Sequence, residues 1–347
     1  MLSGLVGRFG RLSRRQFLTT VAALLPVMGA SVLPAQAADK LTMRLEWTAW
    51  VMHLPLHLAM EKGWFKAADL DVYLEDGNGT ITMVNLVGNG KFDLGHGALA
   101  AMAVGASKGL PTIAVSEYLK KSPLGIIYSK DAGIKSIKDL AGKKIIYTPA
   151  SFESPFLEPF LAHNGIDKSK INLVGVEASA KISSYATGTG DAFVTTVPGD
   201  LPHVEDKRPS DAFLFADYGM NLPTFGIIAN ADVLKTKGDA IKRFTSVVSA
   251  AWAYILAGNV QEAAEATMKQ RPNAPTTVAR LVGEFKRHEP FFGKPTFPGV
   301  QDAGEWAKAL KEMEDAKVIS TGTKPDKYFT NAYIDADYGK KIVSGGK

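Results

Sequence analysis

Apolar and polar residues alternate in several short segments, as expected for strands that bury one face. In the first segment, residues 41–48, the apolar side chains that end with Leu45 and Trp47 share one face, and Glu46 belongs to the polar face. Further strands are expected at residues 70–74, 92–94, 112–115, 124–128, 145–147, 171–176, 192–197, 213–215 and 226–229.

Helical periodicity alternates with these strands. Helices are expected at residues 55–62, 81–87, 98–106, 155–163 and 239–255, and over most of the chain from there to residue 318. Gly63 is expected to end the first helix, while Thr80 and Ser154 suit the N-cap positions of the second and fourth. Because strands and helices alternate, the sequence predicts an α/β fold built on parallel sheets with helices on their faces.

The N-terminal segment has the composition of an export signal. A twin-arginine motif at residues 13–18, SRRQFL, precedes an apolar run at residues 19–32 and a small-residue cleavage site at residues 35–37. A proline and a glycine interrupt the run, which is too short for a permanent membrane span. Residues 1–37 are therefore expected to be a twin-arginine signal peptide.

Composition becomes informative once this leader is set aside. All four charged residues of the leader are arginines, so 36 of the 40 basic residues remain, against 35 acidic residues. This near-neutral balance argues against binding to nucleic acid or to an anionic membrane. The chain has no cysteine, which excludes disulfides, thiolate metal sites and a lipidated anchor. The sequence thus predicts a soluble, monomeric periplasmic protein that is long enough for two lobes.

An ordered series of motifs resembles one family. The series is Trp47-Thr48 with His53, then residues 61–65 (EKGWF), 77–80 (GNGT), 92–95 (FDLG), 140–145 (LAGKKI) and 190–193 (GDAF). In this order the motifs resemble the periplasmic substrate-binding proteins of ABC importers for alkanesulfonate, taurine, nitrate and thiamine-pyrimidine precursors. The resemblance covers roughly residues 40–260, and the ordered set is more specific than any single motif.

The resemblance implies a type II periplasmic binding protein, in which two doubly wound parallel-sheet lobes, joined by two crossover strands, close on a ligand. Residues 38–122 would form the first part of lobe 1, residues 123–225 lobe 2, and residues 226–347 the rest of lobe 1 with the C-terminal helices. The crossings are expected near residues 120–124 and 222–227.

The same resemblance implies a receptor without metal, cofactor or catalysis. It would capture a small organic solute and deliver it to an inner-membrane ABC permease. The solute would be a sulfonate, an aromatic carboxylate or a pyrimidine-like heterocycle.

The candidate ligand site lies beyond the carboxyl ends of the strands, where the loops of such lobes converge. Trp47 and Trp50 follow the first strand, where an indole can stack on a planar ligand. Core packing is the alternative for both. His53 is carried over from the family motif as a hydrogen-bonding residue, with a structural histidine as the alternative.

Two helix starts offer backbone N–H groups to carboxylate, sulfonate or phosphate oxygens, with ordinary helix capping as the alternative. They are Gly79-Thr80 and the segment 151–154, in which Glu153 would oppose an anion but suit a ligand amine. The complete set of expected ligand-binding residues is Trp47, Trp50, His53, Asn78, Gly79, Thr80, Gly97, Tyr118, Ser151, Phe152, Glu153, Ser154 and Thr196.

The chain departs from the pyrimidine-binding members of the family. Those members usually have Pro-Asn after the Trp-Thr pair and Asn before the His, whereas this chain has Ala49-Trp50 and Met52. Val197 replaces an acidic residue that those proteins often have. These changes make the pocket more apolar, which argues against a thiamine-type pyrimidine and favours an aromatic acid or a sulfonate.

An exported NAD(P)-dependent oxidoreductase is the main alternative. Gly95, Gly97 and Ala100 fit the pattern G-x-G-x-x-A between a strand and a helix, and Glu117 lies 20 residues beyond Gly97. However, the pattern lies in the third strand–helix unit rather than the first, and no acid–base pair accompanies it. Dinucleotide binding is therefore the less favoured interpretation.

Other enzymatic patterns fit less well. Ser107 lies in a G-x-S-x-G pattern, but between a helix and a strand, which reverses the order that a hydrolase nucleophile needs. His53 and His57 have the spacing of two zinc ligands without the expected glutamate after the first. The resemblance extends to pyrimidine-precursor synthases that rely on cysteine chemistry, which a chain without cysteine cannot perform. The sequence therefore predicts that the protein is not an enzyme.

Overall fold

A computed structural model describes residues 37–149 and 151–345. The leader expected at residues 1–37 lies outside this part except for its last residue, and residues 38–347 form a unit of their own. Among the described residues, no helix has both the length and the apolar character needed to cross a bilayer.

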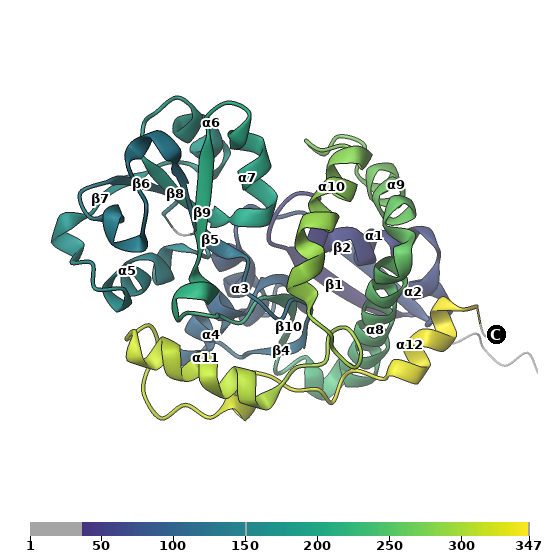
Figure 1. The fold of residues 1–347 in the computed structure, drawn as a ribbon. Coiled ribbons are helices and arrows are strands. Elements are labelled where there is room, and N and C mark those ends of the chain that lie inside the picture. The colour runs from purple at the N-terminus through teal and green to yellow at the C-terminus, as the bar shows by residue number, and fades with distance from the viewer. Residues whose placement is uncertain (1–36, 150, 346–347) are drawn as a thin grey trace, which may run out of the picture. The chain divides into compact units, whose positions relative to one another are not determined.

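The first sheet combines four strands from residues 39–117 with β10, which follows the second sheet along the chain (Figure 1). Its strands, in spatial order, are β2 (Leu70–Glu75), β1 (Asp39–Leu45), β3 (Leu94–Ala98), β10 (Phe225–Asn230) and β4 (Thr112–Glu117). β1 pairs in parallel with β2 and β3, whereas β10 runs antiparallel to both β3 and β4. All six residues of β10 are buried, as expected for a strand with neighbours on both edges.

The second sheet has the same plan. Its order is β7 (Asn172–Gly175), β6 (Lys144–Tyr147), β8 (Ala192–Thr196), β5 (Leu124–Ser129) and β9 (Ser210–Leu214). β5 is antiparallel to both β8 and β9, while β6 pairs in parallel with β7 and β8. The expected α/β fold of type II periplasmic binding proteins is confirmed, with the amendment that both sheets are mixed rather than entirely parallel.

Helices cover both faces of these sheets (Figure 1). They are α1 (Leu54–Glu61), α2 (Trp64–Ala67), α3 (Thr80–Gly88), α4 (Leu99–Ser107), α5 (Ser154–His163), α6 (Lys181–Ala186), α7 (Val197–Glu205), α8 (Leu234–Tyr254), α9 (Val260–Gln270), α10 (Val278–His288), α11 (Ala303–Asp315) and α12 (Ala336–Val343). The sequence pattern missed α12, a short helix that packs against α8.

Three apolar clusters hold these layers together. One lies between the first sheet and helices α1, α8 and α9, where the rings of Phe65 and Phe244 stack at 5.0 Å. A second runs from α3 and α4 through α11 to the inner face of the second sheet, and includes Trp306 and Phe156. The third lies beneath α6 and α7. Burying each such side chain contributes about 1.5–3 kcal/mol.

The chain passes twice between the two sheets. Residues 118–123 lead from β4 to β5, and residues 215–224 lead from β9 to β10. Because both passages lie side by side, the carboxyl end of β4 and the start of β10 meet at this junction. The domain boundaries expected after residues 37, 122 and 225 stay predictions.

Candidate functional site

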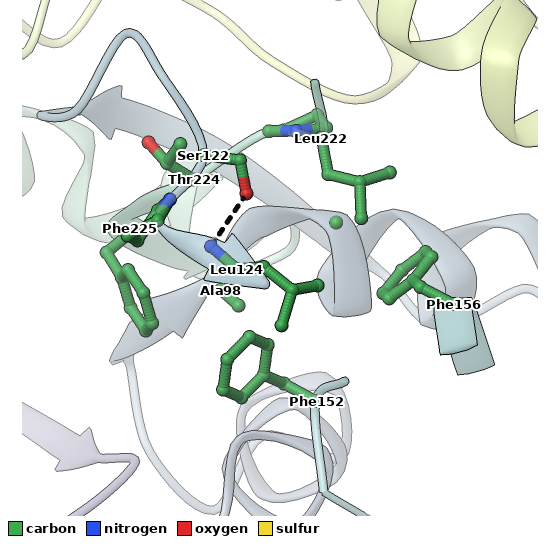
Figure 2. A pocket seen from close by; sticks show the side chains of 11 residues that line it. Ala98, Ser122, Leu124, Phe152, Phe156, Leu222, Thr224 and Phe225 are labelled. Atoms are coloured by element: carbon green, nitrogen blue, oxygen red, sulfur yellow. Dashed lines mark hydrogen bonds between the residues drawn. The ribbon is translucent and has the colours of Figure 1, made fainter. Parts of the chain in front are cut away.

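A pocket lies at the junction where the chain passes between the sheets (Figure 2). Its lining residues are Ala98, Ala100, Ser122, Pro123, Leu124, Phe152, Phe156, Leu222, Pro223, Thr224 and Phe225. They belong to both passages, to the end of β3, to the starts of α4, β5, α5 and β10, and to the segment before α5. The cavity volume is about 10 Å³, which is room for about one water molecule. A larger ligand therefore requires these side chains to separate.

Aromatic rings from both sides meet at this pocket. Phe152, which precedes α5, places its ring 5.6 Å from that of Phe225 at the start of β10. On the other side, the indole of Trp50 lies 5.1 Å from Phe225 and 6.1 Å from His288, in edge-to-face geometry. Trp50 and Phe152 are half-buried, so that both retain surface for a ligand. Such rings bind planar groups through stacking and edge contacts.

Hydrogen bonds tie the two passages to each other. Asn221 Oδ1 accepts a 2.8 Å hydrogen bond from the backbone of Ser122, and Asn221 Nδ2 donates to Lys120 O at 3.2 Å. Nearby, the backbone N–H of Thr224 donates to the buried carboxylate of Glu117 at 2.8 Å, and the Thr224 hydroxyl lies 3.3 Å from the same oxygen. Burial raises the pKa of Glu117 despite these hydrogen bonds. These hydrogen bonds therefore hold the two passages together, so that they are not independent linkers.

Behind the aromatic rings, three side chains from separate elements converge. Glu46 follows β1, His53 precedes α1, and His96 lies in the middle of β3. Glu46 Oε2 lies 3.0 Å from His53 Nε2 and 2.9 Å from His96 Nδ1. Glu46 Oε1 accepts a 2.8 Å hydrogen bond from Trp50 Nε1. The carboxylate thus fixes the indole that packs against Phe225 of the pocket lining.

This cluster of Glu46, His53 and His96 is almost fully buried, with 5%, 0% and 1% of each residue exposed. Burial alone would raise the pKa of Glu46, but the two adjacent imidazoles outweigh it and lower that pKa below its usual range. For His53, desolvation outweighs the attraction of Glu46, so the pKa of the imidazole falls. A carboxylate beside a neutral His53 is the arrangement that follows.

Trp47 and Trp50 occupy different environments. The sequence placed Trp47 on the buried face of the first strand, but β1 ends at Leu45 and Trp47 is 38% exposed. The strand ends there because the backbone carbonyls of Glu46 and Trp47 accept hydrogen bonds from Gly79 and Gly77 instead of from a neighbouring strand. Core packing is therefore wrong for Trp47, and its role as a ligand wall stays a prediction.

The Gly79-Thr80 turn differs from the expected cap. Gly79 has φ of 144°, a conformation that favours glycine, and its N–H donates to Glu46 O at 2.6 Å. Thr80 is the first residue of α3, and its buried hydroxyl has no hydrogen-bond partner among the described residues. Asn78 is exposed beside them. The Gly79 N–H thus already has an acceptor. This helix start therefore offers fewer free backbone N–H groups to an anion than the sequence suggested.

Polar groups of the segment 151–154 already form hydrogen bonds and an ion pair within the protein. Ser151 Oγ donates to Thr148 O at 2.7 Å, and Ser154 N donates to Ser151 O at 3.2 Å. The helix boundary also shifts by one residue, because Ser154 is the first residue of α5 rather than its N-cap. Glu153 is buried and pairs with Lys181 Nζ at 2.5 Å. Of this segment, Phe152 alone lines the pocket.

Gly97, Tyr118 and Thr196 lie around the junction rather than in the pocket lining. Tyr118 is buried, with its ring 5.8 Å from that of Trp252 in the core. Thr196 ends β8 and pairs with Leu124, which does line the pocket. Of the site residues expected from the sequence, Phe152 lines the pocket, and the ligand-binding role of the whole set stays a prediction.

The dinucleotide-binding alternative is contradicted by the position of its glycines. Gly95 and Gly97 lie within β3, which the sequence placed at residues 92–94, and they are paired with β10 rather than forming a turn. A Cβ on Gly97 would lie 2.5 Å from Met83 Cε and 3.2 Å from Thr80 Cγ2. These glycines allow α3 to pack on β3 and do not cradle a phosphate. Ser107 ends α4 and donates to Val104 O at 2.8 Å, which does not suit a hydrolase nucleophile.

Sequence reasoning missed several residues of the site. Glu46 was assigned to the polar face of its strand, and His96 was read as part of a glycine-rich turn. The glycines on both sides of His96 were the available signal, since a strand with such small neighbours admits other side chains closely. Phe156 and Phe225 carried no signal beyond their apolar character.

Comparison with known proteins gives the family. The profile of the family described as "NMT1/THI5 like" matches residues 50–262, which is more than half of the chain. The 4-amino-5-hydroxymethyl-2-methylpyrimidine phosphate synthase of Aspergillus parasiticus is 25% identical over 318 residues, covering 87% of this chain and 90% of that protein. A Legionella pneumophila protein of the same name is 23% identical over 302 residues, covering 85% and 92%.

Solved structures show the same fold at low identity. The periplasmic aliphatic sulphonate binding protein SsuA of Escherichia coli has a TM-score of 0.66 and 13% identity, covering 83% of this chain and 91% of that chain. The periplasmic nitrate-binding protein NrtA of Synechocystis PCC 6803 has a TM-score of 0.60 and 14% identity, covering 88% of each chain.

The names of the relatives correct one expectation. The sequence predicted that the protein is not an enzyme, but several relatives at 23–27% identity are named as pyrimidine phosphate synthases. The absence of cysteine in this chain does not outweigh relatives of this name that match 87% and 85% of it. The family profile, the two mixed sheets and the ordered motifs agree: the chain belongs to the NMT1/THI5-like family.

Proposed function

We propose that this protein binds a small planar ligand, of the pyrimidine type, in the pocket at the junction of the two sheets. The observation that carries the proposal is the position of Phe152, whose ring meets that of Phe225 at 5.6 Å from the side of the second sheet, while Trp50 packs on Phe225 at 5.1 Å. Flat rings on both sides of a cavity suit a flat ligand, because stacking and edge contacts act over its whole face.

The ligand class rests on the relatives. Their names refer to a substituted aminopyrimidine phosphate, and they match nearly the whole chain. The apolar departures at Ala49, Trp50 and Met52 favoured an aromatic acid or a sulfonate, but Ala49 and Met52 are buried and do not line the pocket. They therefore say little about the ligand, and a pyrimidine-like heterocycle becomes the first candidate.

Binding would require the two sides of the pocket to separate and close again. Apart from the passages, Arg287 of α10 holds the sides together, donating from Nε to Pro198 O at the start of α7 (2.8 Å). A hinge at the two passages, with contacts that re-form over the ligand, is the motion used by many two-lobed binding proteins. The small cavity then corresponds to a closed arrangement.

Delivery to an inner-membrane ABC permease is the transport role that follows. It is supported by the twin-arginine motif and by structural similarity to periplasmic sulfonate- and nitrate-binding proteins. In that role the protein would act in the periplasm and would present its closed, ligand-bound form to the permease.

A ligand screen by thermal shift tests the proposal. Wild-type protein should be stabilised by an aminopyrimidine such as 4-amino-5-hydroxymethyl-2-methylpyrimidine, since ligand at 100 times its Kd adds about 2.7 kcal/mol. Phe152→Ala should weaken binding by a factor of roughly 5–150, as about 1–3 kcal/mol of ring contact is lost. Tyr73→Ala is the matched control, because Tyr73 is 57% exposed on an edge strand away from the pocket.

The outcomes separate the ligand classes. Stabilisation by sulfonates or aromatic carboxylates but not by pyrimidines would assign the pocket to those ligands instead. Binding that is unchanged in Phe152→Ala would show that the site lies elsewhere.

A second candidate function is synthesis of the pyrimidine phosphate itself, which the names and coverage of the relatives favour. Mass spectrometry of protein incubated with cell extract would detect 4-amino-5-hydroxymethyl-2-methylpyrimidine phosphate. Formation of this product above that of heat-inactivated protein would support synthesis, and its absence would leave binding as the function.

A further inference from the structure

We propose that Glu46, His53 and His96 form a binding site for a divalent transition-metal cation. The three residues come from three separate segments, the end of β1, the start of α1 and the middle of β3. One ligand atom from each lies within 4.8 Å of the other two. Two imidazoles and one carboxylate are the ligand set of the facial triad that holds Fe(II) in many proteins, and they also suit zinc.

The spacing of the ligand atoms fits this coordination. Glu46 Oε2 is 3.0 Å from His53 Nε2 and 2.9 Å from His96 Nδ1. Neighbouring ligands of an octahedral ion with bonds of about 2.1 Å lie about 3.0 Å apart. Glu46 Oε2 therefore lies from each imidazole nitrogen at the spacing of two neighbouring ligands of such an ion. Small shifts of the three side chains would make room for the ion between them.

The charge balance points the same way. Among residues 37–149 and 151–345, no lysine or arginine forms an ion pair with Glu46, and its charged partners are the two histidines. A carboxylate this deeply buried is costly unless a positive charge accompanies it. Trp50 contributes one neutral N–H to Glu46 Oε1. A divalent cation would neutralise the carboxylate and leave that hydrogen bond intact.

Free nitrogen atoms in the cluster give a third, independent observation. His53 Nδ1 and His96 Nε2 are buried and have no hydrogen-bond partner among the described residues. Each imidazole thus uses one nitrogen in the cluster, and Trp50 Nε1 also donates to His53 Nε2 at 3.2 Å, which favours an unprotonated Nε2 on that ring. His53 Nε2 and His96 Nδ1 are the nitrogens that face the carboxylate and that would bind an ion there.

The proposed ion would lie directly behind the ligand pocket. Trp50 and His96 both contact Phe225, with ring centres 5.1 Å and 6.3 Å away, and Phe225 lines the pocket. An ion held by Glu46 would therefore fix Trp50 through the shared carboxylate. The site differs from the His53/His57 spacing seen in the sequence, because His57 does not belong to the cluster.

Metal titration of the mature protein tests the site. Protein treated with a chelator and then dialysed should take up one Co²⁺ or Zn²⁺ per chain, and the visible spectrum of Co²⁺ reports nitrogen and oxygen ligands. His96→Gln and Glu46→Gln should each weaken uptake at least about tenfold. Metal should also raise the Tm of wild type but not of these variants.

Two control variants locate the site. His288→Gln removes an equally buried histidine that contacts Trp50 but lies outside the cluster, and His163→Gln removes an exposed histidine. Both should bind metal as the wild type does. Failure of wild type to take up one ion per chain, or unchanged uptake by His96→Gln and Glu46→Gln, would overturn the proposal. The titration contains no organic ligand, so its result does not depend on the ligand screen.

Discussion

The backbone amide of Thr224 donates a 2.8 Å hydrogen bond to the carboxylate of Glu117, which lies 107 residues earlier in the chain. The Thr224 hydroxyl also donates to Leu119 O at 2.6 Å. One residue of the second passage is therefore bonded both to the last residue of β4 and to Leu119 of the first passage. Any hinge between the sheets has to bend around this fixed point.

Thr224→Val should lower the free energy of unfolding by about 1–3 kcal/mol. The valine keeps the shape of the side chain but leaves the buried carbonyl of Leu119 without its donor. Urea denaturation measures the change. Thr236→Val, at an exposed threonine, is the control and should change stability by less than about 0.5 kcal/mol. Equal losses of unfolding free energy in both variants would show that the buried Thr224 hydroxyl stabilises the fold no more than the exposed Thr236 hydroxyl does.

Lys181→Met should destabilise the protein by about 3–5 kcal/mol, because it leaves Glu153 buried without its cation. The side chains of Lys181 and Glu153 are only 12% and 1% exposed. The double variant Lys181→Met/Glu153→Gln should recover most of this loss. Lys235→Met, which removes an exposed pair with Asp232, should cost at most about 1 kcal/mol. The expectation fails if the double variant is no more stable than Lys181→Met.

His57→Leu should raise the free energy of unfolding at neutral pH. It should also make that free energy fall less as the pH is lowered. Neither ring nitrogen of His57 has a partner in the described part of the chain, and burial lowers its pKa to about 3. The unfolded chain takes up this proton near pH 6.5. Because the unfolded state binds more protons between these values, stability falls as the pH drops from about 6.5 to 3.

Unfolding measured at several pH values checks this, with His288→Leu as the control. Burial lowers the pKa of His288 to about 4, so this variant should also respond less to acid. His288 Nδ1 bonds to Glu284 O at 2.9 Å, however, and its loss should reduce stability at neutral pH. A His57→Leu variant with an unchanged acid response would contradict the assigned pKa.

Trp47→Ala and Trp50→Ala should separate a ligand wall from a core residue. Trp47 is 38% exposed, so its truncation should cost less than about 1 kcal/mol of stability, whereas half-buried Trp50 should cost about 3 kcal/mol. At least one of the two should weaken ligand binding by about 1–3 kcal/mol. Leu45→Ala, at a fully buried position of β1, is the core control. Normal affinity in both folded variants would remove the tryptophans from the site.

Replacing Arg14 and Arg15 by lysine should leave the precursor in the cytoplasm. The twin-arginine pathway reads a pair of guanidinium groups, which an ammonium does not reproduce. Cell fractionation and immunoblotting measure the distribution. Undiminished periplasmic protein would contradict the assignment of residues 1–37 as a twin-arginine signal.

The sequence predicted the architecture better than the site. Alternation along residues 41–45 and 70–74 is a local property, and the corresponding strands β1 and β2 are present. The antiparallel direction of β10 was not predicted, because strand direction depends on the path of the chain between sheets rather than on local pattern. Gly95 and Gly97 fit the local pattern of a glycine-rich turn, but pairing with β10 places them in a buried strand.

The site was harder because it depends on contacts between distant segments. Glu46 was assigned to a polar face by its alternation, yet it is buried by His53 and by His96, which lies 50 residues away. Phe225 meets Phe152 only after the two sheets have come together. Trp50 was identified from its residue type and position, whereas its hydrogen bond to Glu46 required the folded backbone.

The position of β10 has a consequence for the order in which the chain folds. β10 lies between β3 and β4, so β4 has no neighbouring strand until residues 225–230 have been synthesised. By then every strand of the second sheet has been made. The first sheet therefore depends on contacts of high sequence separation, which form slowly. A nascent chain that ends after β9 would expose the open edge of β3, where it would be prone to pair with other chains.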